Sequence, residues 1–550
     1  MKQIKNPQNE EVKNVIFAMI LVTIIMFAFN YFNAQKSQDI VAPNNQISQS
    51  ETVIQETTSA MVENKDVSPE YDVEPVELQN EYVRAFFNPS LGGFENLSLL
   101  KYKETLDEES KNVTVLDKNY HSSIIWQANE INLPNKNTLW QEKKDLSTAD
   151  KKVFEFVNTD VKIIREVVLD DKYLFTIKDT ITNLKQAPIN VYQKGTISRK
   201  MEAYPPVSTV HQGFVAYLND ELIEEKYADD KNIFSDKTKD GWFGFTDKYW
   251  QSLMILNPNE NVEISFDSDK DVYNATFKTE QIVLNPNQSV TKTIRLFVGA
   301  KDIDVINTYQ KEQKINHFDL SIDFGWFRFL TQPFLHFLNM LYDILGNMGI
   351  AILVFATLIR LALLPIATKS YESMAKMRKI QPKIKVLQTR FKQDPRRMQI
   401  EMANLYKREK INPASGCLPL LLQIPVFFAL YKVLSISINM RQAPFFGWIQ
   451  DLSMPDTLTP FNGFGYFDFE LPGLLTIGVW PILMGITMYM QQKLSPAPSD
   501  KTQAKIMMFL PVIFTLMMAS FASGLIIYWT WSNILSIFQQ KYIMRKVGVE

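Results

Sequence analysis

Cysteine and histidine are scarce in this chain of 550 residues. Its one cysteine, Cys417, excludes an internal disulfide framework. The four histidines lie far apart in the sequence, and no cysteine cluster accompanies them, so we expect no metal site. The sequence also lacks a phosphate-binding glycine loop, a GxSxG turn and an HExxH helix. We therefore expect no catalytic residues, no cofactor and no enzymatic activity.

Acidic residues are absent from every long apolar run, whereas Arg360 lies inside one of them, at residues 350–366. A guanidinium in hydrocarbon costs several kcal/mol, and its charge cannot be removed by titration. Such a residue is tolerated where it faces water, a cavity or a bound partner. Arg360 is therefore the first candidate for a functional site.

The N-terminal region predicts a membrane anchor followed by a tether. Residues 15–32 are apolar over a length that spans a bilayer as a helix. Three lysines in residues 1–14 favour a cytoplasmic N-terminus. No small-residue cleavage pattern follows, so we expect an uncleaved signal anchor. Residues 33–80 are rich in Gln, Ser, Asn, Glu and Thr, which is typical of a flexible periplasmic linker.

The pattern changes to strands between residues 81 and 322. Two alternating segments, 161–169 and 173–181, flank a turn at Asp170, which predicts a hairpin. Residues 290–298 alternate at period two behind a turn that contains proline and asparagine. We predict a large periplasmic all-β domain of the sandwich type.

A polar stripe distinguishes residues 325–346 from the apolar segments that follow. Its members recur at helical spacing: Arg328, Gln332, His336, Asn339 and Asp343. We therefore predict an amphipathic helix that lies in the membrane interface. Beyond it we predict five more transmembrane helices, at residues 349–367, 417–438, 474–490, 505–521 and 523–538.

Charge sets the predicted topology. Residues 368–415 carry 13 Lys or Arg against four Asp or Glu, a net charge of +9 that places this loop in the cytoplasm. The acidic segment 440–472 belongs in the periplasm, and the basic tail 541–550 in the cytoplasm. Six transmembrane helices with both termini cytoplasmic satisfy these assignments. Within the basic loop, helical spacing of apolar residues and the pair Asp394-Pro395 predict a helical hairpin.

Polar residues recur in several of the predicted spans: Thr357, Gln423, Tyr528 and Ser532. Helical rise places Arg360 about 10 Å from the cytoplasmic boundary. If these side chains face one another, they line a hydrated groove with a fixed positive charge that receives hydrophilic segments of a client protein. We predict that Arg360, Gln423, Thr357, Tyr528 and Ser532 contact the substrate. Lys432 lies near the outer end of its span, and we expect it to snorkel outward.

The same region resembles the YidC/Oxa/Alb family, in its Gram-negative form with a large periplasmic domain. The resemblance is carried by residues 373–378, 416–425 and 523–528 and by the pair Ser532-Asn533. It implies a five-helix core that is closed to the periplasm, and a periplasmic β-supersandwich. The family's groove arginine falls on Arg360 and its polar groove residue on Gln423. The family threonine is not matched, since its position holds Ala356.

The resemblance implies a membrane protein insertase and chaperone of the bacterial inner membrane that inserts, folds and helps assemble other proteins. Implied partners are nascent membrane proteins, membrane lipids, the SecYEG translocon, and the ribosome with its signal-recognition machinery, which would meet the basic hairpin and tail. No DNA partner is expected. The residues alone leave two alternatives open, a small-solute transporter and a receptor with a ligand-binding periplasmic β-domain.

Overall fold

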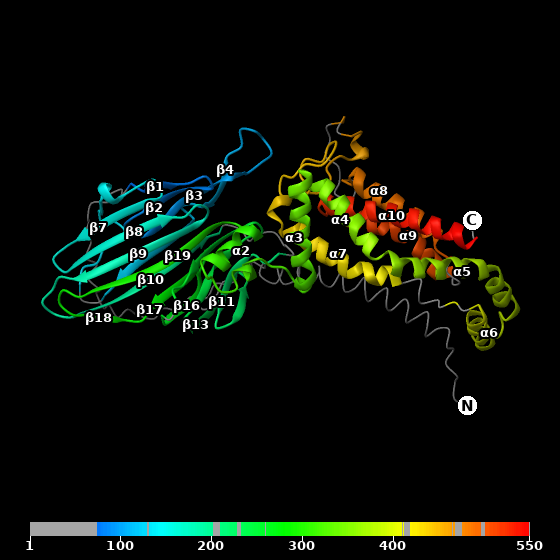
Figure 1. Ribbon diagram of the computed structural model, residues 1–550, viewed down its shortest axis with the longest axis horizontal. Coiled ribbons are helices and arrows are strands. Elements are labelled where there is room, and N and C mark those ends of the chain that lie inside the picture. Colours follow the sequence, from blue (N-terminus) through cyan, green and yellow to red (C-terminus); the bar gives the residue numbers. More distant parts are fainter. Residues whose placement is uncertain are drawn as a thin grey trace, which may run out of the picture.

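The computed structural model describes residues 74–128, 131–201, 210–227, 233–258, 260–409, 411, 418–464, 466–467, 476–496 and 501–548. Figure 1 shows two parts, a β-domain and a helical part, that meet near helices α3 (Arg328–Leu345) and α7 (Leu418–Ile436). The predicted cytoplasmic segment 1–14, the signal anchor 15–32 and Cys417 lie outside the described residues, as does most of the predicted linker.

The β-domain forms three antiparallel sheets. One has the order β1-β2-β3-β4, and the second has the order β13-β16-β17-β10-β18 with β5 also paired to β10. The third has the order β12-β11-β14-β15-β19-β9-β8-β7-β6. The strands are β1 Val76–Gln79, β2 Val83–Asn88, β3 Gly93–Lys103, β4 Asn112–Leu116, β5 Tyr120–Gln127, β6 Gln141–Glu142, β7 Lys151–Val157, β8 Val161–Leu169, β9 Leu174–Asn183, β10 Ile189–Lys200, β11 Gly213–Leu218, β12 Glu221–Glu225, β13 Phe234–Thr238, β14 Gly241–Thr246, β15 Trp250–Ile255, β16 Val262–Asp269, β17 Val272–Thr279, β18 Ile282–Leu284 and β19 Ser289–Ala300.

The core lies between the nine-stranded sheet and the two smaller sheets. Phe94 of β3 contacts Phe175 of β9, with ring centroids 4.4 Å apart, which brings the four-stranded sheet onto the largest one. Phe214 of β11 stacks on Phe266 of β16 at 4.7 Å, which brings the six-stranded sheet onto it as well. Alternating burial along β8 fits a strand with one face in this core. The prediction of a large all-β domain is confirmed.

Local details of the β-domain agree with the sequence in part. The predicted hairpin is present as β8 and β9, where Asp170 accepts backbone hydrogen bonds from Lys172 and Leu174 at 2.9 Å each. The strands begin at Val76, inside the segment predicted to be a tether. After Ala300 the chain forms helix α2 (Ile303–Glu312) and the 3₁₀ turn η2 (Phe318–Ser321), which cover the outer face of the nine-stranded sheet (Figure 1).

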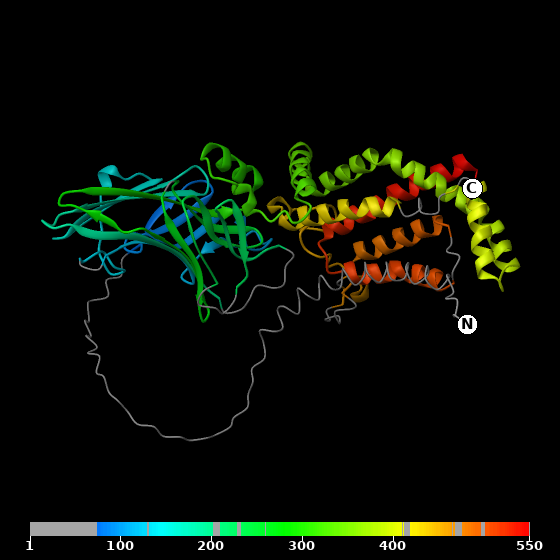
Figure 2. The same cartoon turned by 90° about the horizontal axis from the view of Figure 1, so that it is seen from below.

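Among the described residues, the helical part contains α3 and α7 and six further helices. Figure 2 shows α7, α8, α9 and α10 side by side. The remaining bounds are α4 Met348–Ala362, α5 Leu364–Arg390, α6 Pro395–Arg408, α8 Val479–Leu494, α9 Lys501–Met518 and α10 Ser523–Val547, with short 3₁₀ turns η1 Lys144–Leu146, η4 Ile438–Met440 and η5 Pro460–Asn462.

Several predicted helix bounds are wrong. α8 spans Val479–Leu494 instead of 474–490, and α9 spans Lys501–Met518 instead of 505–521. The span predicted at 349–367 ends at Ala362, because Pro365 starts a new helix, and α5 leaves α4 at an angle of 68°. Helix α10 continues to Val547 and includes most of the tail that was predicted to follow the last span. In the described part of the chain no single helix is both long and apolar enough to cross a bilayer. The bent pair α4–α5 meets that criterion jointly, by length and composition.

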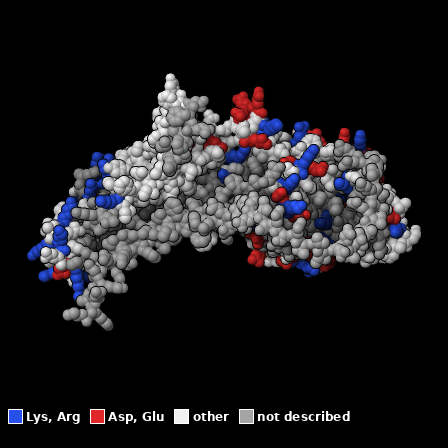
Figure 3. Space-filling view, turned by 180° about the vertical axis from the view of Figure 1, so that it is seen from behind, with Lys and Arg blue, Asp and Glu red and all other residues white. Residues whose placement is uncertain are grey.

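The basic loop forms two helices. α5 ends at Arg390 and α6 begins after Asp394, whose side chain accepts a hydrogen bond from the backbone of Arg397 at 3.1 Å, so the predicted N-cap is confirmed. Ile380, Ile384 and Ile411 are buried in a small cluster between these helices. Figure 3 shows Lys and Arg side chains gathered at this end of the helical part, away from the β-domain.

Candidate functional site

Four polar residues form a ladder along one face of α10. Tyr528, Ser532, Ser536 and Gln540 follow one another at intervals of four residues, which places them on the same side of a helix. All four side chains are buried. Helices α4, α5, α7 and α8 all contact α10. We call these four residues the polar ladder.

Two predicted site residues join the ladder from other helices. Gln423 of α7 donates a hydrogen bond to the Tyr528 hydroxyl at 2.8 Å. The Nη2 group of Arg360, at the end of α4, donates to the Ser536 hydroxyl and to the Tyr371 hydroxyl, the latter at 2.9 Å. Ser536 in turn donates to the backbone carbonyl of Ser532 at 2.7 Å. Residues from four helices thus meet in one polar region.

Arg360 lacks a charged partner within the described residues. No carboxylate there forms an ion pair with its guanidinium, and its Nε group is buried without a hydrogen-bond acceptor. The side-chain nitrogen and oxygen of Gln540, one turn beyond Ser536, are likewise buried and find no hydrogen-bond partner in the part of the chain that the structure describes. Unsatisfied buried donors and acceptors are costly, so this region is suited to receive water or polar groups of another molecule.

Among the described contacts, Thr357 is the one predicted site residue whose hydrogen bonds lie away from the polar ladder. Its hydroxyl accepts a hydrogen bond from the Trp531 indole at 3.0 Å and donates to the Leu353 carbonyl at 2.8 Å. The Trp531 bond joins α4 to α10 beside the ladder, whereas the Leu353 bond lies within α4. Ala356, at the position of the family threonine, is buried in the apolar core.

Sequence reasoning missed Tyr371, Ser536 and Gln540. Ser536 and Gln540 continue the spacing of Tyr528 and Ser532 by four and eight residues, so the helical period contained the signal. Tyr371 was assigned to the cytoplasmic loop. It reaches Arg360 because the bend after Ala362 carries α5 across the end of α4.

The prediction that Lys432 snorkels outward is wrong. Its Nζ lies 2.6 Å from a carboxylate oxygen of Asp323, which precedes α3, and the two side chains are only 13% and 19% exposed. The ion pair compensates the charge at the outer end of α7.

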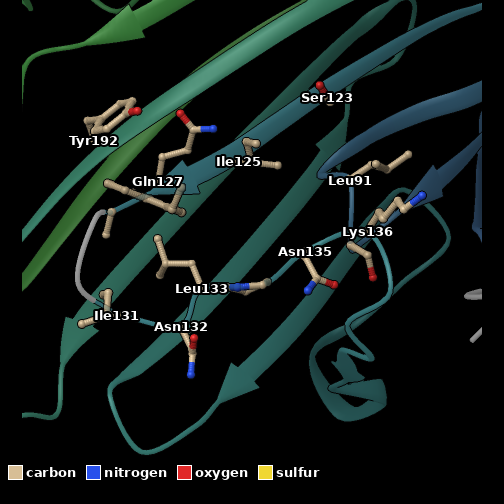
Figure 4. Close-up of a pocket in the computed structure, with 14 residues that line it drawn as sticks. Leu91, Ser123, Ile125, Gln127, Ile131, Asn132, Leu133, Asn135, Lys136 and Tyr192 are labelled. Atoms are coloured by element: carbon tan, nitrogen blue, oxygen red, sulfur yellow. The ribbon is translucent and has the colours of Figure 1, made fainter. Parts of the chain in front are cut away.

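A separate pocket of about 650 Å³ lies on the β-domain, against β5 and the loop that follows it. Figure 4 shows Gln127, Asn132, Asn135 and Tyr192 around it, together with aliphatic side chains. Lys136 supplies the charge in its lining. Amides beside aliphatic groups can bind neutral polar molecules, but they offer no acid–base pair. Across the described residues, no group of three or more His, Cys, Asp or Glu side chains is placed to hold a metal ion.

Comparison with known proteins assigns both parts of the chain. Residues 75–337 match the family model described as the YidC periplasmic domain, and residues 340–549 match that of the 60Kd inner membrane protein. The membrane protein insertase YidC of Rickettsia bellii is 39% identical over 560 residues, which cover 97% of this chain and 99% of the relative. The chain belongs to the YidC family. The YidC of Rickettsia massiliae is 38% identical, with the same coverage of both chains.

Solved structures of YidC proteins give weaker likenesses. A crystal structure of an active YidC insertase with its first transmembrane domain resolved is 18% identical and covers 85% of this chain and 95% of its own, with a TM-score of 0.36. YidC from Thermotoga maritima is 16% identical and covers 84% and 96%, with a TM-score of 0.28. The family assignment rests on the sequence matches, which also support an inner-membrane protein with a periplasmic β-domain.

Proposed function

We propose that this protein inserts membrane proteins by receiving their hydrophilic segments at the polar ladder and releasing their apolar helices to lipid. Membership of the YidC family supports insertion as the activity. The ladder supplies polar contacts at the meeting point of α4, α5, α7 and α10. Exposed apolar side chains on α9, such as Phe509, Val512 and Ile513, supply a surface that suits lipid or an apolar helix.

The observation that carries the proposal is the state of Arg360. Its guanidinium is half-buried, contacts only neutral hydroxyls among the described residues and has an unsatisfied Nε group. A fixed positive charge in such a site lowers the cost of moving an acidic or polar segment into the bilayer. Water and client segments would complete the hydrogen bonds of Arg360 and Gln540. This is the chemistry expected of a hydrated cationic groove.

We place the helical part in the inner membrane with six spans and both termini in the cytoplasm. The signal anchor at 15–32 would form the first span, and α4, α7, α8, α9 and α10 the others. α3 would lie in the outer interface, since Trp326 and Phe329 near its start are 99% and 75% exposed. This arrangement puts the β-domain in the periplasm and the α5–α6 hairpin in the cytoplasm.

The basic hairpin and the end of α10 suit partners that carry negative charge. Exposed lysines and arginines cover α5, α6 and the last turns of α10 (Figure 3). We propose that this surface meets ribosomal RNA, signal-recognition machinery and anionic lipid, and that the protein works alone or beside the SecYEG translocon. The family assignment makes insertion a better account than solute transport or ligand reception.

Site-specific photo-crosslinking tests the proposal. A photoreactive residue at Ser532, on the polar ladder, should form adducts with the hydrophilic segment of a two-span membrane protein during its synthesis. The matched control is Phe538, on the same helix, which is 69% exposed and points away from the ladder. The proposal predicts strong adducts from position 532 and weak ones from position 538 with the same segment.

Two outcomes would count against the ladder. Equal adducts at both positions would mean that clients pass along the lipid face of α10 without entering the polar region. Absence of adducts at position 532, with normal expression and with insertion still supported, would place the hydrophilic segment elsewhere.

A further inference from the structure

The contact between the β-domain and α7 suggests a role for residues that lie outside the polar ladder. α7 carries Gln423, and Lys432 lies nine residues further along the same helix, about 14 Å by helical rise. Lys432 pairs with Asp323, in the segment that connects the β-domain to α3. One helix therefore joins the ladder to the β-domain.

The segment around Asp323 is shaped to hold the lysine. Asp323 accepts backbone hydrogen bonds from Gly325 and from His211 of the β-domain, each at 3.0 Å. Gly325 has a φ of +68°, and the aliphatic stem of Lys432 passes over it: a Cβ at Gly325 would lie 3.4 Å from the Lys432 Cε. A side chain at position 325 would strain the turn because of its positive φ, while its Cβ would meet the lysine stem at an ordinary contact distance.

Charges behind Asp323 keep it ionised. Burial alone would raise the pKa of this carboxyl, but Lys432, the His211 amide and Lys301 together hold the pKa below its ordinary value. Lys301 is buried in the β-domain, and its ammonium donates to the Asp247 carbonyl at 2.7 Å. Asp247 in turn pairs with Arg199 at 2.8 Å. The carboxylate of Asp323 is thus embedded in a polar network of the β-domain.

A second contact holds the chain just beyond α7. Arg441 donates to the backbone carbonyls of Lys103 and Glu104, at 2.6 and 3.1 Å, at the end of β3. The Arg441 guanidinium also lies over the ring of Trp250, 5.5 Å from its centre. Since Lys432 and Arg441 flank the outer end of α7, the β-domain contacts that end at two points.

We propose that Asp323 and Lys432 are positioning residues for insertion: through this ion pair the β-domain fixes the outer end of α7 and so holds Gln423 against the ladder. This inference rests on the proposed function, because that function gives Gln423 its role at the polar ladder, where it contacts the client. It adds that the β-domain contributes to insertion through one largely buried ion pair. Arg441 provides a second, weaker attachment, because its partners are backbone carbonyls at an exposed edge.

Charge exchange in the full-length protein tests the pair. The variants are Lys432→Glu, Asp323→Lys and the double exchange, each reconstituted in vesicles of inner-membrane lipids and supplied with a two-span client. Each single variant places two like charges together in a largely buried site, so each should insert the client about tenfold more slowly or worse. The double exchange should recover part of the rate, because it restores opposite charges but not the hydrogen bonds that Asp323 accepts from the His211 and Gly325 amides. Lys432→Arg, which keeps the charge, should stay close to wild type.

A structural measurement accompanies the rate. The single variants should speed hydrogen exchange at the outer end of α7 and in the segment around Asp323, and the double exchange should slow it again. If the pair served folding alone, the single variants would lower the yield of folded protein, and the double charge exchange would not restore both the insertion rate and the slow hydrogen exchange.

The outcomes separate this proposal from the proposed function. If wild-type protein inserts no client in the same vesicles, the proposed function fails. If wild type inserts the client and both single variants do so at the same rate, the positioning role is refuted and the proposed function stands.

Discussion

The buried ion pair between Arg165 of β8 and Asp179 of β9 should dominate the stability of the β-domain. The two side chains are 2% and 0% exposed. They pair through two hydrogen bonds, from Nε to Oδ1 at 2.7 Å and from Nη2 to Oδ2 at 2.6 Å. The carboxylate also accepts from the Trp126 indole at 3.1 Å. We predict that Asp179→Asn, which keeps the shape but removes the charge, strongly destabilises this domain.

The size of the destabilisation by Asp179→Asn depends on the contacts that Arg165 retains. Breaking a buried pair by removing one charge typically costs about 3–5 kcal/mol. The guanidinium retains its hydrogen bonds to the carbonyls of Pro89 and Ile124, at 3.0 and 2.9 Å, and its contact with the Trp140 ring. These contacts place the loss at the lower end, at about 3 kcal/mol, which is a large share of the roughly 5–15 kcal/mol that stabilises a typical protein.

Hydrogen–deuterium exchange of the full-length protein in detergent measures this loss. Where exchange of β8 and β9 amides requires opening of the domain, about 3 kcal/mol corresponds to roughly a hundredfold faster exchange. The control is Glu77→Gln, which breaks an ion pair with Arg84 whose side chains are 43% and 52% exposed. This surface pair should contribute less than about 1 kcal/mol. If the β8 and β9 amides of Asp179→Asn exchanged within threefold of the wild-type rate, the predicted loss of about 3 kcal/mol would be refuted.

Three further predictions concern single side chains. Burial lowers the pKa of Lys301 from 10.5 to about 8. Between these two pH values the unfolded chain still holds the proton on Lys301, whereas the folded chain has lost it. The stability of the wild type relative to Lys301→Met should therefore rise with pH, by up to about 3 kcal/mol, and thermal unfolding of both proteins from pH 7 to 10 measures this rise. Tyr528→Phe removes the acceptor of Gln423 and should slow insertion of a client with a polar translocated segment more than that of an apolar one, in a reconstituted assay. Asp456 accepts from the Trp480 amide and the Trp448 indole, at 2.8 Å each, and from the Leu458 amide at 3.1 Å. Asp456→Ala should therefore speed hydrogen exchange both in the first turn of α8 and around Leu458, at a cost above the ~1 kcal/mol of a single lost cap.

The sequence predicted features that depend on local chemistry. The β8–β9 hairpin follows from two alternating segments around Asp170, and the start of α6 follows from an N-cap residue before a proline. The stripe of polar residues likewise predicted the helix found as α3. In each case residues within a few positions of one another determine the structure.

Features that join distant segments were missed. The pair Lys432–Asp323 spans 109 residues, and nothing near Lys432 in the sequence indicates its partner. The contact of Tyr371 with Arg360 requires the 68° bend between α4 and α5, whereas the sequence analysis predicted one span across residues 349–367. Ser536 could have been found, since it extends the four-residue spacing of Tyr528 and Ser532.

Insertion assays on Arg360 variants test most directly whether insertion depends on the positive charge at the polar ladder. Wild type, Arg360→Lys and Arg360→Ala should be reconstituted in full-length form and supplied with two clients that differ only in whether the translocated segment is acidic or neutral. The account predicts that Arg360→Lys inserts both clients, and that Arg360→Ala fails with the acidic client more than with the neutral one, because a fixed charge favours an opposite charge in a site of low dielectric constant. Full activity of Arg360→Ala on the acidic client would contradict the account and leave hydration of the ladder as the better explanation.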